Sequence, residues 1–361
     1  MILIPGCTFG QTFGPKEEAR MKQAVMRSPG RIEFLEVPAP MPGPAEVLIR
    51  MKRIGVCGSD IHVWHGKHAL TPYPVVQGHE VSGVVESVGA AVRGFAPGDK
   101  VTIQPQVTCG TCYPCTHGAY HICDSLKVMG FQTTGAGSEL FAVEGSKVLK
   151  LPPGMDLEHG AMVEPLAVAV HALARGGDIA GKSVIVLGAG TIGNLVAQTA
   201  RALGAAKVMI TDLSDYRLGI AAKCGIALGV NTGSSDLAAA IEKHFGADKA
   251  DLILECVGSR TTIEQAVAVA RKGTDIIVVG VFGEKPAVDL GTVQDRELRL
   301  IGTLMYREPD WRKAIELLGA GKISLAPLIT DHFAFADYSK AYQYIDANRD
   351  RAMKVMIVMD R

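Results

Sequence analysis

The sequence predicts an α/β protein that combines a small antiparallel β-barrel with a doubly wound parallel sheet. Short β-type runs, broken by Pro and Gly, extend from Met21 to about Val107 and indicate the barrel. Continuous apolar runs begin near Lys182 and alternate with helical patterns. They indicate the parallel sheet, because strands buried on both faces lack polar alternation. The length of 361 residues leaves room for about two domains.

The barrel strands are expected where turn signals separate the β-type runs. Turns rich in Pro and Gly lie at 39–44 and 96–99. The expected strands occupy 31–37, 46–54, 81–88 and 100–105. A first strand begins naturally at Met21, so residues 1–20 are expected to form an N-terminal extension. The strand-like run 354–359 is too short to form a domain, and we expect it to return to the barrel.

The parallel sheet is expected to start at Ser183–Leu187, a continuous apolar run. A helix is predicted from Asn194 to Leu203, and the next strand, Lys207–Thr211, leads into Asp212. Strand and helix patterns then alternate through 251–257, 263–270, 275–281 and 298–304. This alternation predicts a doubly wound sheet of six strands. A further helix is predicted at Trp311–Gly319.

Composition excludes several classes of protein. The 37 basic residues balance the 37 acidic residues, so there is no electrostatic argument for binding nucleic acid or an anionic membrane surface. No apolar run approaches the roughly 20 residues of a membrane span. The first residues lack the basic lead and the long apolar segment of a signal peptide. We therefore expect a soluble, cytoplasmic protein.

Four of the eight cysteines crowd into one short segment, at Cys109, Cys112, Cys115 and Cys123. Four thiolates at this spacing can enclose one tetrahedral ion and leave no open position, which is typical of a structural zinc site. Four thiolates could also hold an iron–sulfur cluster. The short final spacing and the absence of Pro after Cys123 favour zinc. The remaining alternative is a set of ordinary thiols.

A second set of metal-ligating residue types is spread along the chain. Cys57 lies between glycines, His79 and Glu80 follow Gly78, and Glu164 stands in an otherwise apolar stretch. Thiolate, imidazole and carboxylate together suit Zn²⁺, and an open fourth position would make the site catalytic. A lone His-Glu pair is usually a surface accident, so the prediction depends on the whole set.

A glycine pattern follows the first strand of the expected parallel sheet. Gly188, Gly190 and Gly193 stand between a strand and a helix, and Asp212 comes nineteen residues after the last glycine. Such a turn lets backbone amides and a helix N-terminus approach a pyrophosphate, while the acid binds a ribose diol. The negative charge of Asp212 would repel a 2′-phosphate, so the pattern favours NAD over NADP. The alternative is a plain turn between a strand and a helix.

With these motifs in order, the chain resembles the zinc-dependent medium-chain dehydrogenases/reductases, and most of all their sorbitol (polyol) dehydrogenase branch. The resemblance implies a GroES-like catalytic domain built from 21–165 and 305–361, which includes a structural zinc lobe at 109–123. It also implies a Rossmann NAD-binding domain at 166–304, with the active site in the cleft between the two domains.

The resemblance also implies roles for individual residues. Cys57 and His79 match catalytic zinc ligands, and Glu80 matches a glutamate that is a ligand or lies close to one. Glu164 stands where many alcohol dehydrogenases have a second cysteine, which indicates the polyol branch. The implied cofactor-binding residues are Gly188, Gly190, Ile192, Gly193, Asp212 and Arg217, the last two at the ribose. Met305-Tyr306 departs from the Arg-Tyr of the branch, and this bears on sorbitol as the substrate but not on the chemistry.

The same resemblance suggests how the reaction would proceed. Zinc would act as a Lewis acid on the substrate hydroxyl. Ser59 could hydrogen-bond that hydroxyl, and His62 could pass its proton outward through the nicotinamide ribose. Hydride would then leave the carbinol carbon for the nicotinamide. The alternatives are that Ser59 is a turn or capping serine and that His62 is an ordinary surface histidine.

The expected function is therefore NAD-dependent, zinc-dependent interconversion of a secondary alcohol of a polyol, sugar or sugar acid with the ketone. One alternative is a threonine- or butanediol-type dehydrogenase on the same scaffold. Others are a zinc-free quinone or enoyl reductase and a non-catalytic NAD-binding module. The family leads us to expect a homodimer or homotetramer that pairs through the last Rossmann strand.

Overall fold

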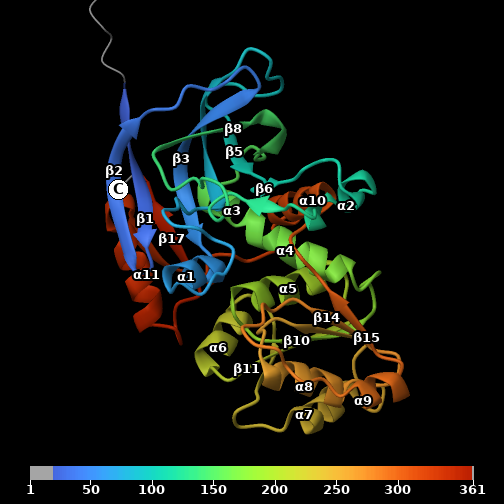
Figure 1. Ribbon diagram of the computed structural model, residues 1–361. Helices are drawn as coiled ribbons and strands as arrows, with labels where there is room; N and C mark the ends of the chain where they lie inside the picture. Colours follow the sequence, from blue (N-terminus) through green and yellow to red (C-terminus); the bar gives the residue numbers. More distant parts are fainter. Residues whose placement is uncertain (1–18, 360–361) are drawn as a thin grey trace, which may run out of the picture.

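The computed structural model describes residues 19–359, and the expected extension at 1–20 lies almost wholly outside this range. Two large β-sheets organise the described chain (Figure 1). One is formed by strands from both ends of the described chain, and the other by strands from the segment between them. None of the described helices is long and apolar enough to cross a membrane.

The second sheet has six strands, all parallel, and confirms the doubly wound prediction. Its spatial order is β12 (Leu228–Asn231), β11 (Lys207–Asp212), β10 (Ser183–Leu187), β13 (Leu252–Glu255), β14 (Asp275–Val278) and β15 (Arg299–Gly302). From β10 the chain adds β11 and β12 on one side and then crosses over to add β13, β14 and β15 on the other, so the strand order reverses between β10 and β13. In open parallel sheets, ligands bind in the crevice at the carboxyl ends of the strands at this switch point.

Helices cover both faces of the parallel sheet, as buried parallel strands require. These helices are α5 (Thr191–Ala202), α6 (Asp215–Lys223), α7 (Leu237–Phe245), α8 (Arg260–Val269) and α9 (Leu290–Asp295). Helix α5 begins three residues earlier than the predicted helix, directly after the glycine turn. Its first turn is therefore available to a ligand that approaches that turn.

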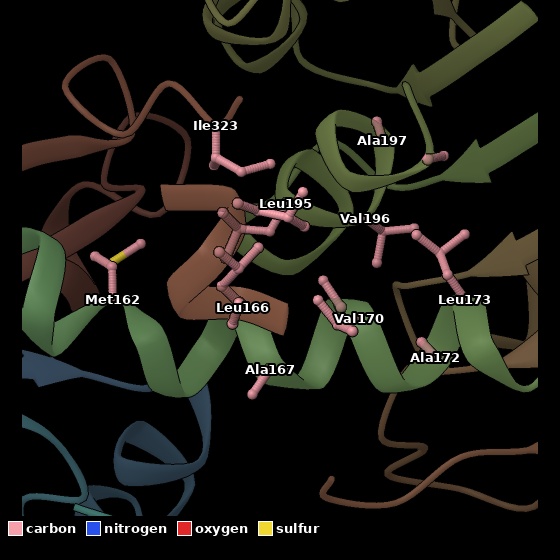
Figure 2. Packing of buried hydrophobic residues seen from close by; sticks show 14 of the residues in the cluster. Met162, Leu166, Ala167, Val170, Ala172, Leu173, Leu195, Val196, Ala197 and Ile323 are labelled. Carbon is pink, nitrogen blue, oxygen red and sulfur yellow. The ribbon is translucent and has the colours of Figure 1, made fainter. Parts of the chain in front are cut away.

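Helix α4 (Val163–Ala174) is the most deeply buried helix next to this sheet. Figure 2 shows Leu166 and Val170 of α4 packed toward Leu195 and Val196 of α5. Helix α10 (Glu308–Gly319) packs against the same helix. Because α4 begins at Val163, this packing holds Glu164 in the protein interior at the helix N-terminus.

The first sheet is largely antiparallel and has seven strands. The path runs through β16 (Ile329–Ala334), β17 (Lys354–Val358), β3 (Glu46–Val56), β4 (Glu80–Val88), β5 (Lys100–Ile103) and β9 (Val148–Lys150), and β8 (Leu140–Glu144) pairs with β3. Strand β17 lies between β16 and β3, so the run at 354–359 returns to this sheet as expected. A hairpin, β1 (Arg20–Ser28) and β2 (Arg31–Pro38), lies beside it.

Besides three 3₁₀ helices, at Tyr120–Ile122, Gly145–Lys147 and Phe335–Asp337, the described chain has six further elements. They are the helices α1 (Gly58–Trp64), α2 (Tyr113–Thr116), α3 (Leu157–Ala161) and α11 (Tyr338–Ala347), and the two-residue strands β6 (Gln106–Val107) and β7 (Lys127–Val128). Helix α2 lies in the cysteine-rich segment, and α1 follows β3 directly. Helix α1 thus begins at the end of a central strand, where Cys57 stands.

We propose that the chain divides into the two domains expected from the sequence. Each of the two sheets has a hydrophobic core of its own, one around β3 and β4 and the other around β13, which supports this division. Helix α4 continues through the expected boundary at 165/166, and its core reaches both Met162 and Leu254. The boundary at 305 falls in the connection between β15 and α10.

Candidate functional site

Antiparallel pairing of β3 with β4 brings three candidate metal ligands together. Gly55 pairs with Glu80 across the two strands, so Cys57, just past the end of β3, lies next to His79 and Glu80. One ligand atom from each of the three residues lies within 4.8 Å of the others. A Cβ on Gly55 would overlap the Glu80 side chain, so this close approach requires glycine.

His79 lies beside a buried hydrogen-bond network that is centred on Asp60. Its Nδ1 lies 3.6 Å from Oδ1 of Asp60. Gln77 donates to the same oxygen at 2.9 Å, and Tyr342 donates to Gln77 at 3.0 Å. The other Asp60 oxygen accepts from the backbone N–H of Cys57 at 2.9 Å. Asp60 is therefore hydrogen-bonded to the backbone of Cys57 and lies within ion-pair distance of His79, the place where a carboxylate commonly stands beside a metal-binding histidine.

The charges around His79 fit a divalent cation. Burial lowers the pKa of His79, but Asp60, Cys57 and Glu164 outweigh burial and hold the pKa well above its ordinary value. The donor set is thus a concentration of negative groups that favours a positive charge at its centre. A thiolate, an imidazole and a carboxylate at this separation are the ligand types that zinc prefers.

Glu80 has a second partner, Lys354 of β17. The Lys354 ammonium forms a buried ion pair with Glu80 and donates to the carbonyl of Val56 at 3.1 Å. Burial alone lowers the pKa of Lys354, but Glu80 and Cys57 raise it above its ordinary value. The lysine therefore remains charged and shares Glu80 with the candidate metal site.

Glu164 lies close to this group but is not one of the three residues in it. Its Oε1 accepts a hydrogen bond of 2.6 Å from the hydroxyl of Tyr306, which is fully buried. Burial raises the pKa of Glu164 to about 7, and nearby Glu80 adds to the rise, while His79 and Tyr306 oppose it. The structure thus separates the two glutamates: Glu80 lies with Cys57 and His79, and Glu164 pairs with Tyr306.

The four clustered cysteines also converge. One sulfur from each of Cys109, Cys112, Cys115 and Cys123 lies within 4.8 Å of the others. Cys109 accepts a backbone N–H bond from Cys112 at 3.3 Å, and Cys123 accepts one from Cys109 at 3.3 Å. Backbone hydrogen bonds from Thr111 and Cys112 lower the pKa of Cys109 to about 6. Burial, together with hydrogen bonds among the cysteines, raises the pKa of Cys115 to about 12. Four sulfurs that converge in this way fit a tetrahedral zinc with no open position.

The glycine turn after β10 has the geometry of a phosphate cradle. Gly188 has a φ of +101°, and a Cβ on Gly193 would overlap the Gly188 carbonyl. A Cβ on Gly190, by contrast, would meet no atom within 4 Å. Gly190 therefore faces open space at the start of α5, where a pyrophosphate could approach the helix N-terminus. This shape fits a dinucleotide.

Asp212, at the end of β11, connects to the glycine turn. Its Oδ2 accepts from the N–H of Ala189 at 2.8 Å, and its Oδ1 accepts from the N–H of Ser214 at 2.9 Å. Arg217 lies 3.9 Å from Oδ2 and also donates to the carbonyl of Arg349 at 2.7 Å. Asp212 and Arg217 therefore lie together at the carboxyl ends of the parallel strands.

Two clefts connect the candidate metal site with the carboxyl ends of the parallel strands. The first has a volume of about 520 Å³ and is lined by Cys57, His62 and Ile192 among others. The second, of about 480 Å³, includes Gly188 and Asp212. Gly190, Arg217 and Cys256 line both clefts. An elongated ligand can therefore extend from Asp212, past the glycine turn, to Cys57.

The two residues predicted for proton transfer lie on α1. Ser59 is half-buried, two positions beyond Cys57, and His62 is exposed and lines the first cleft. The structure thus places His62, an exposed side chain, in the lining of the cleft that Cys57 also lines.

Three residues at this site were assigned no role from the sequence: Asp60, Lys354 and Tyr306. Asp60 follows Cys57 by three positions, the spacing of an acid that caps a helix start, and this signal could have indicated it. Lys354 opens an apolar strand, and a charge in that position indicates a buried partner. Nothing in the sequence pairs Tyr306 with Glu164.

Two family models match the chain. The model described as "Alcohol dehydrogenase GroES-like domain" matches residues 43–153, and the model described as "Zinc-binding dehydrogenase" matches residues 191–320. The first match covers β3 to β9 of the antiparallel sheet and both candidate metal sites, Cys57 with His79 and Glu80 and the four clustered cysteines. The second covers the glycine turn after its first residues and most of the parallel sheet.

Characterised relatives match nearly the whole chain. It is 37% identical to 2-dehydro-3-deoxy-L-galactonate 5-dehydrogenase of Pseudoalteromonas atlantica, over 88% of this chain and 92% of the relative. It is 33% identical to human sorbitol dehydrogenase, over 93% of this chain and 95% of the relative. A crystal structure of a short chain alcohol dehydrogenase from Escherichia coli, complexed with the cofactor NADH, is also similar. The TM-score is 0.88 at 28% identity, with 94% of this chain and 99% of that chain covered.

Proposed function

The chain belongs to the zinc-dependent medium-chain dehydrogenases, in their sorbitol dehydrogenase-like branch, and we propose that it interconverts a secondary alcohol with its ketone, with NAD as hydride acceptor. One observation carries the proposal. Cys57, His79 and Glu80 converge at one end of a continuous pair of clefts, and the glycine turn and Asp212 lie toward the other. Such a cleft can hold an alcohol and a dinucleotide end to end.

Two zinc sites follow from the donor sets. Cys57, His79 and Glu80 would hold the catalytic ion, with Glu164 beside it, and the four clustered cysteines would hold a structural one. When bound, the catalytic ion supplies Lewis-acid polarisation of the substrate oxygen. Asp60 and Lys354 act on the ligands: Asp60 orients His79, and Lys354 holds Glu80.

Proton movement is assigned to α1. The Ser59 hydroxyl would hydrogen-bond the substrate hydroxyl and carry its proton to Nδ1 or Nε2 of His62. His62 lines the first cleft and is exposed, which supports its role as the last group before solvent. Histidine is suited to this role because its proton affinity lies near neutral pH.

Preference for NAD over NADP is assigned to Asp212. Its carboxylate stands where the adenosine ribose would lie, at the end of β11 and in the second cleft. A 2′-phosphate would bring a second negative charge to the same place. Arg217 is close enough to contact the ribose but also pairs with Asp212, so its charge is partly neutralised.

The substrate class is proposed to be a polyol, a sugar or a sugar acid. The named relatives act on sorbitol and on a deoxy sugar acid. Tyr306 matches the tyrosine of the Arg-Tyr pair expected in the branch, whereas Met305 replaces the arginine. An apolar methionine removes a charged partner for substrate hydroxyls, so we expect a substrate other than sorbitol.

We further propose a cytoplasmic homodimer or homotetramer. The seven cysteines in the described residues are all free thiols, which agrees with a reducing compartment. Strand β15 is the last strand of the parallel sheet, and Leu300 and Leu304 on or beside it are exposed. A second copy could pair with this edge and cover both side chains.

The test is a spectrophotometric screen of zinc-replete protein with NAD⁺ against polyols, sugar acids, threonine and simple secondary alcohols. We expect reduced nicotinamide to form with one polyhydroxylated class and to be lost on chelation. NADP⁺ and the Cys57→Ala variant serve as controls. Equal turnover by Cys57→Ala, or turnover that survives complete loss of metal, would contradict the proposal. Oxidation of threonine or butanediol alone would transfer the assignment to that alternative.

A further inference from the structure

The turn that follows β13 lines both clefts, and it begins directly after a buried glutamate, Glu255. This residue ends β13 at the switch point of the parallel sheet and is 0% exposed. Cys256, which follows it, lines both clefts, and Val257, Ser259 and Thr262 line the second. The turn after Glu255 is therefore the part of the sheet edge past which a dinucleotide must run.

One oxygen of Glu255 organises this turn. Its Oε1 accepts the backbone N–H of Val257 at 2.8 Å, the N–H of Gly258 at 2.8 Å and the hydroxyl of Thr262 at 2.7 Å. Three donors on one carboxylate oxygen form strong, charge-assisted hydrogen bonds in a buried environment. They tie the turn and the first part of α8 to the end of β13.

The backbone of Glu255 holds the neighbouring loop as well. Its carbonyl accepts the N–H groups of Val279 and Gly280, at 2.8 and 2.9 Å. Gly258 has a φ of +77°, and a Cβ there would overlap the backbone of Val281. The turn after β13 and the loop after β14 are thus packed backbone to backbone, and neither can shift without the other.

The organised turn meets the glycine turn directly. A Cβ on Gly188 would lie 2.6 Å from Cγ2 of Val257, so the valine side chain packs onto the bare backbone of that glycine. Val257 is nevertheless 48% exposed, which leaves an apolar surface at the cleft. The hydrogen bonds to Glu255 fix the distance between the Val257 side chain and Gly188.

We propose that Glu255 and Thr262 are positioning residues for the dinucleotide. Together they fix the positions of Cys256 and Val257 relative to the glycine turn, where the cofactor passes from one cleft to the other. Neither residue would touch the reacting atoms. This inference rests on the proposed cofactor cleft and is independent of which alcohol is oxidised.

The test uses Thr262→Val, which removes one donor to Glu255 with little change in volume, and Thr262→Ser, which restores the hydroxyl. The matched control is Thr274→Val. Thr274 is buried in the same domain and directly precedes β14, so it lies at the amino ends of the parallel strands, whereas Glu255 lies at the carboxyl ends. It donates its hydroxyl to the carbonyl of Ala250 at 3.2 Å. Glu255→Ala is a stronger second variant. The Kd for NADH is measured by fluorescence titration, with kcat at saturating NAD⁺ measured separately.

Loss of one charge-assisted hydrogen bond is expected to raise the Kd of Thr262→Val for NADH about five- to tenfold. We expect kcat to change less than about twofold, Thr262→Ser to restore the Kd, and Thr274→Val to lower the melting temperature without changing the Kd. An unchanged Kd in folded Thr262→Val, or the same rise in Thr274→Val, would overturn the inference. If the unaltered protein fails to bind NADH, the proposed function fails instead. Should Glu255→Ala not fold, the threonine variants decide the question.

Discussion

The hydroxyl of Tyr306 donates a hydrogen bond of 2.6 Å to Glu164, and both side chains are buried. The carbonyl of Tyr306 accepts from Gln106 at 2.7 Å, and its ring packs edge-on against Trp311. The tyrosine is thus held on several sides and can hold Glu164 in turn. It links the connection after β15 to α4 and to the segment that precedes the cysteine cluster.

Tyr306→Phe tests this link. The substitution keeps the ring but leaves a buried carboxylate oxygen without its donor, which typically lowers stability by about 1–3 kcal/mol. We expect that loss together with reduced turnover, because Glu164 loses its orientation beside the metal ligands. Denaturant unfolding and kcat/KM provide the measurement. Tyr113→Phe, at an exposed position, is the control and should match the unaltered protein. Unchanged stability and turnover in Tyr306→Phe would show that the bond does not matter.

Cys57→Ala and His79→Ala test the catalytic zinc assignment. Each removes one of three converging ligands, so we expect turnover to fall by at least about 10³-fold. The glycine turn is untouched, and the Kd for NADH should stay within about twofold. Metal analysis and fluorescence titration separate the two effects. Full turnover in either variant refutes the site.

Cys112→Ser tests the structural site. A hydroxyl is a poor replacement for a thiolate ligand, so zinc content should fall from about two ions per chain to about one. The lobe has few buried apolar residues, and we expect the melting temperature to drop while residual folded protein keeps its kcat. Cys224→Ser, at a cysteine outside both clusters, controls for the replacement of a thiol by a hydroxyl, and its zinc content should stay at about two ions per chain. A melting temperature equal to that of the unaltered protein would argue against a structural role.

Asp212→Ala and Asp212→Asn test cofactor choice. Removal of the charge should raise the ratio of kcat/KM for NADP⁺ to that for NAD⁺ by about tenfold or more. The N–H groups of Ala189 and Ser214 donate to different oxygens of Asp212, and asparagine has a single acceptor oxygen. Asp212→Asn can therefore keep one of these two bonds, whereas Asp212→Ala loses both. A ratio that does not move in Asp212→Asn would place the discrimination elsewhere.

Asp310 provides a test of pH dependence away from the metal ligands. Burial raises the pKa of Asp310, but hydrogen bonds from His171 and from the backbone of Arg307 outweigh it, and the pKa lies below the ordinary value of 3.8. A carboxyl group with a lowered pKa stabilises the fold above its unfolded pKa and loses that contribution as pH falls through the folded value.

Asp310→Asn should therefore be less stable than the unaltered protein by about 1 kcal/mol at pH 7, and the difference should shrink below about pH 4. Asparagine keeps an acceptor for His171, which lies 2.8 Å from the carboxylate, so the difference reports the charge. Unfolding midpoints measured from pH 3 to pH 7 give the profile. A difference that does not depend on pH would show that shape, and not charge, is responsible.

The sequence predicted those parts of the site in which residue type and local spacing indicate the chemistry. The four close cysteines, the His-Glu pair and the glycine turn with Asp212 each depend on local order, and the structure places each within its own cluster. The zinc-dependent family and the fold predicted from them are confirmed by the family matches. The roles of individual residues remain proposals for experiment.

The partners of these residues depend on contacts that local order does not encode. Lys354 meets Glu80 across 274 positions because β17 enters the sheet next to β3. Tyr306 meets Glu164 across 142 positions because α4 and α10 pack together. Helix α11 was not predicted either, although its Tyr342 supports Asp60 through Gln77. In each case long-range packing determines which side chain becomes the partner.

The position of β17 also sets an order of events during synthesis on the ribosome. All six strands of the parallel sheet precede β16 and β17, so that sheet can assemble while β17 is still inside the exit tunnel. Until β17 emerges and pairs with β3, Glu80 lacks Lys354 and the sheet that carries Cys57 and His79 has an exposed edge. The parallel sheet and its glycine turn can thus form before the sheet that carries Cys57 and His79 is complete.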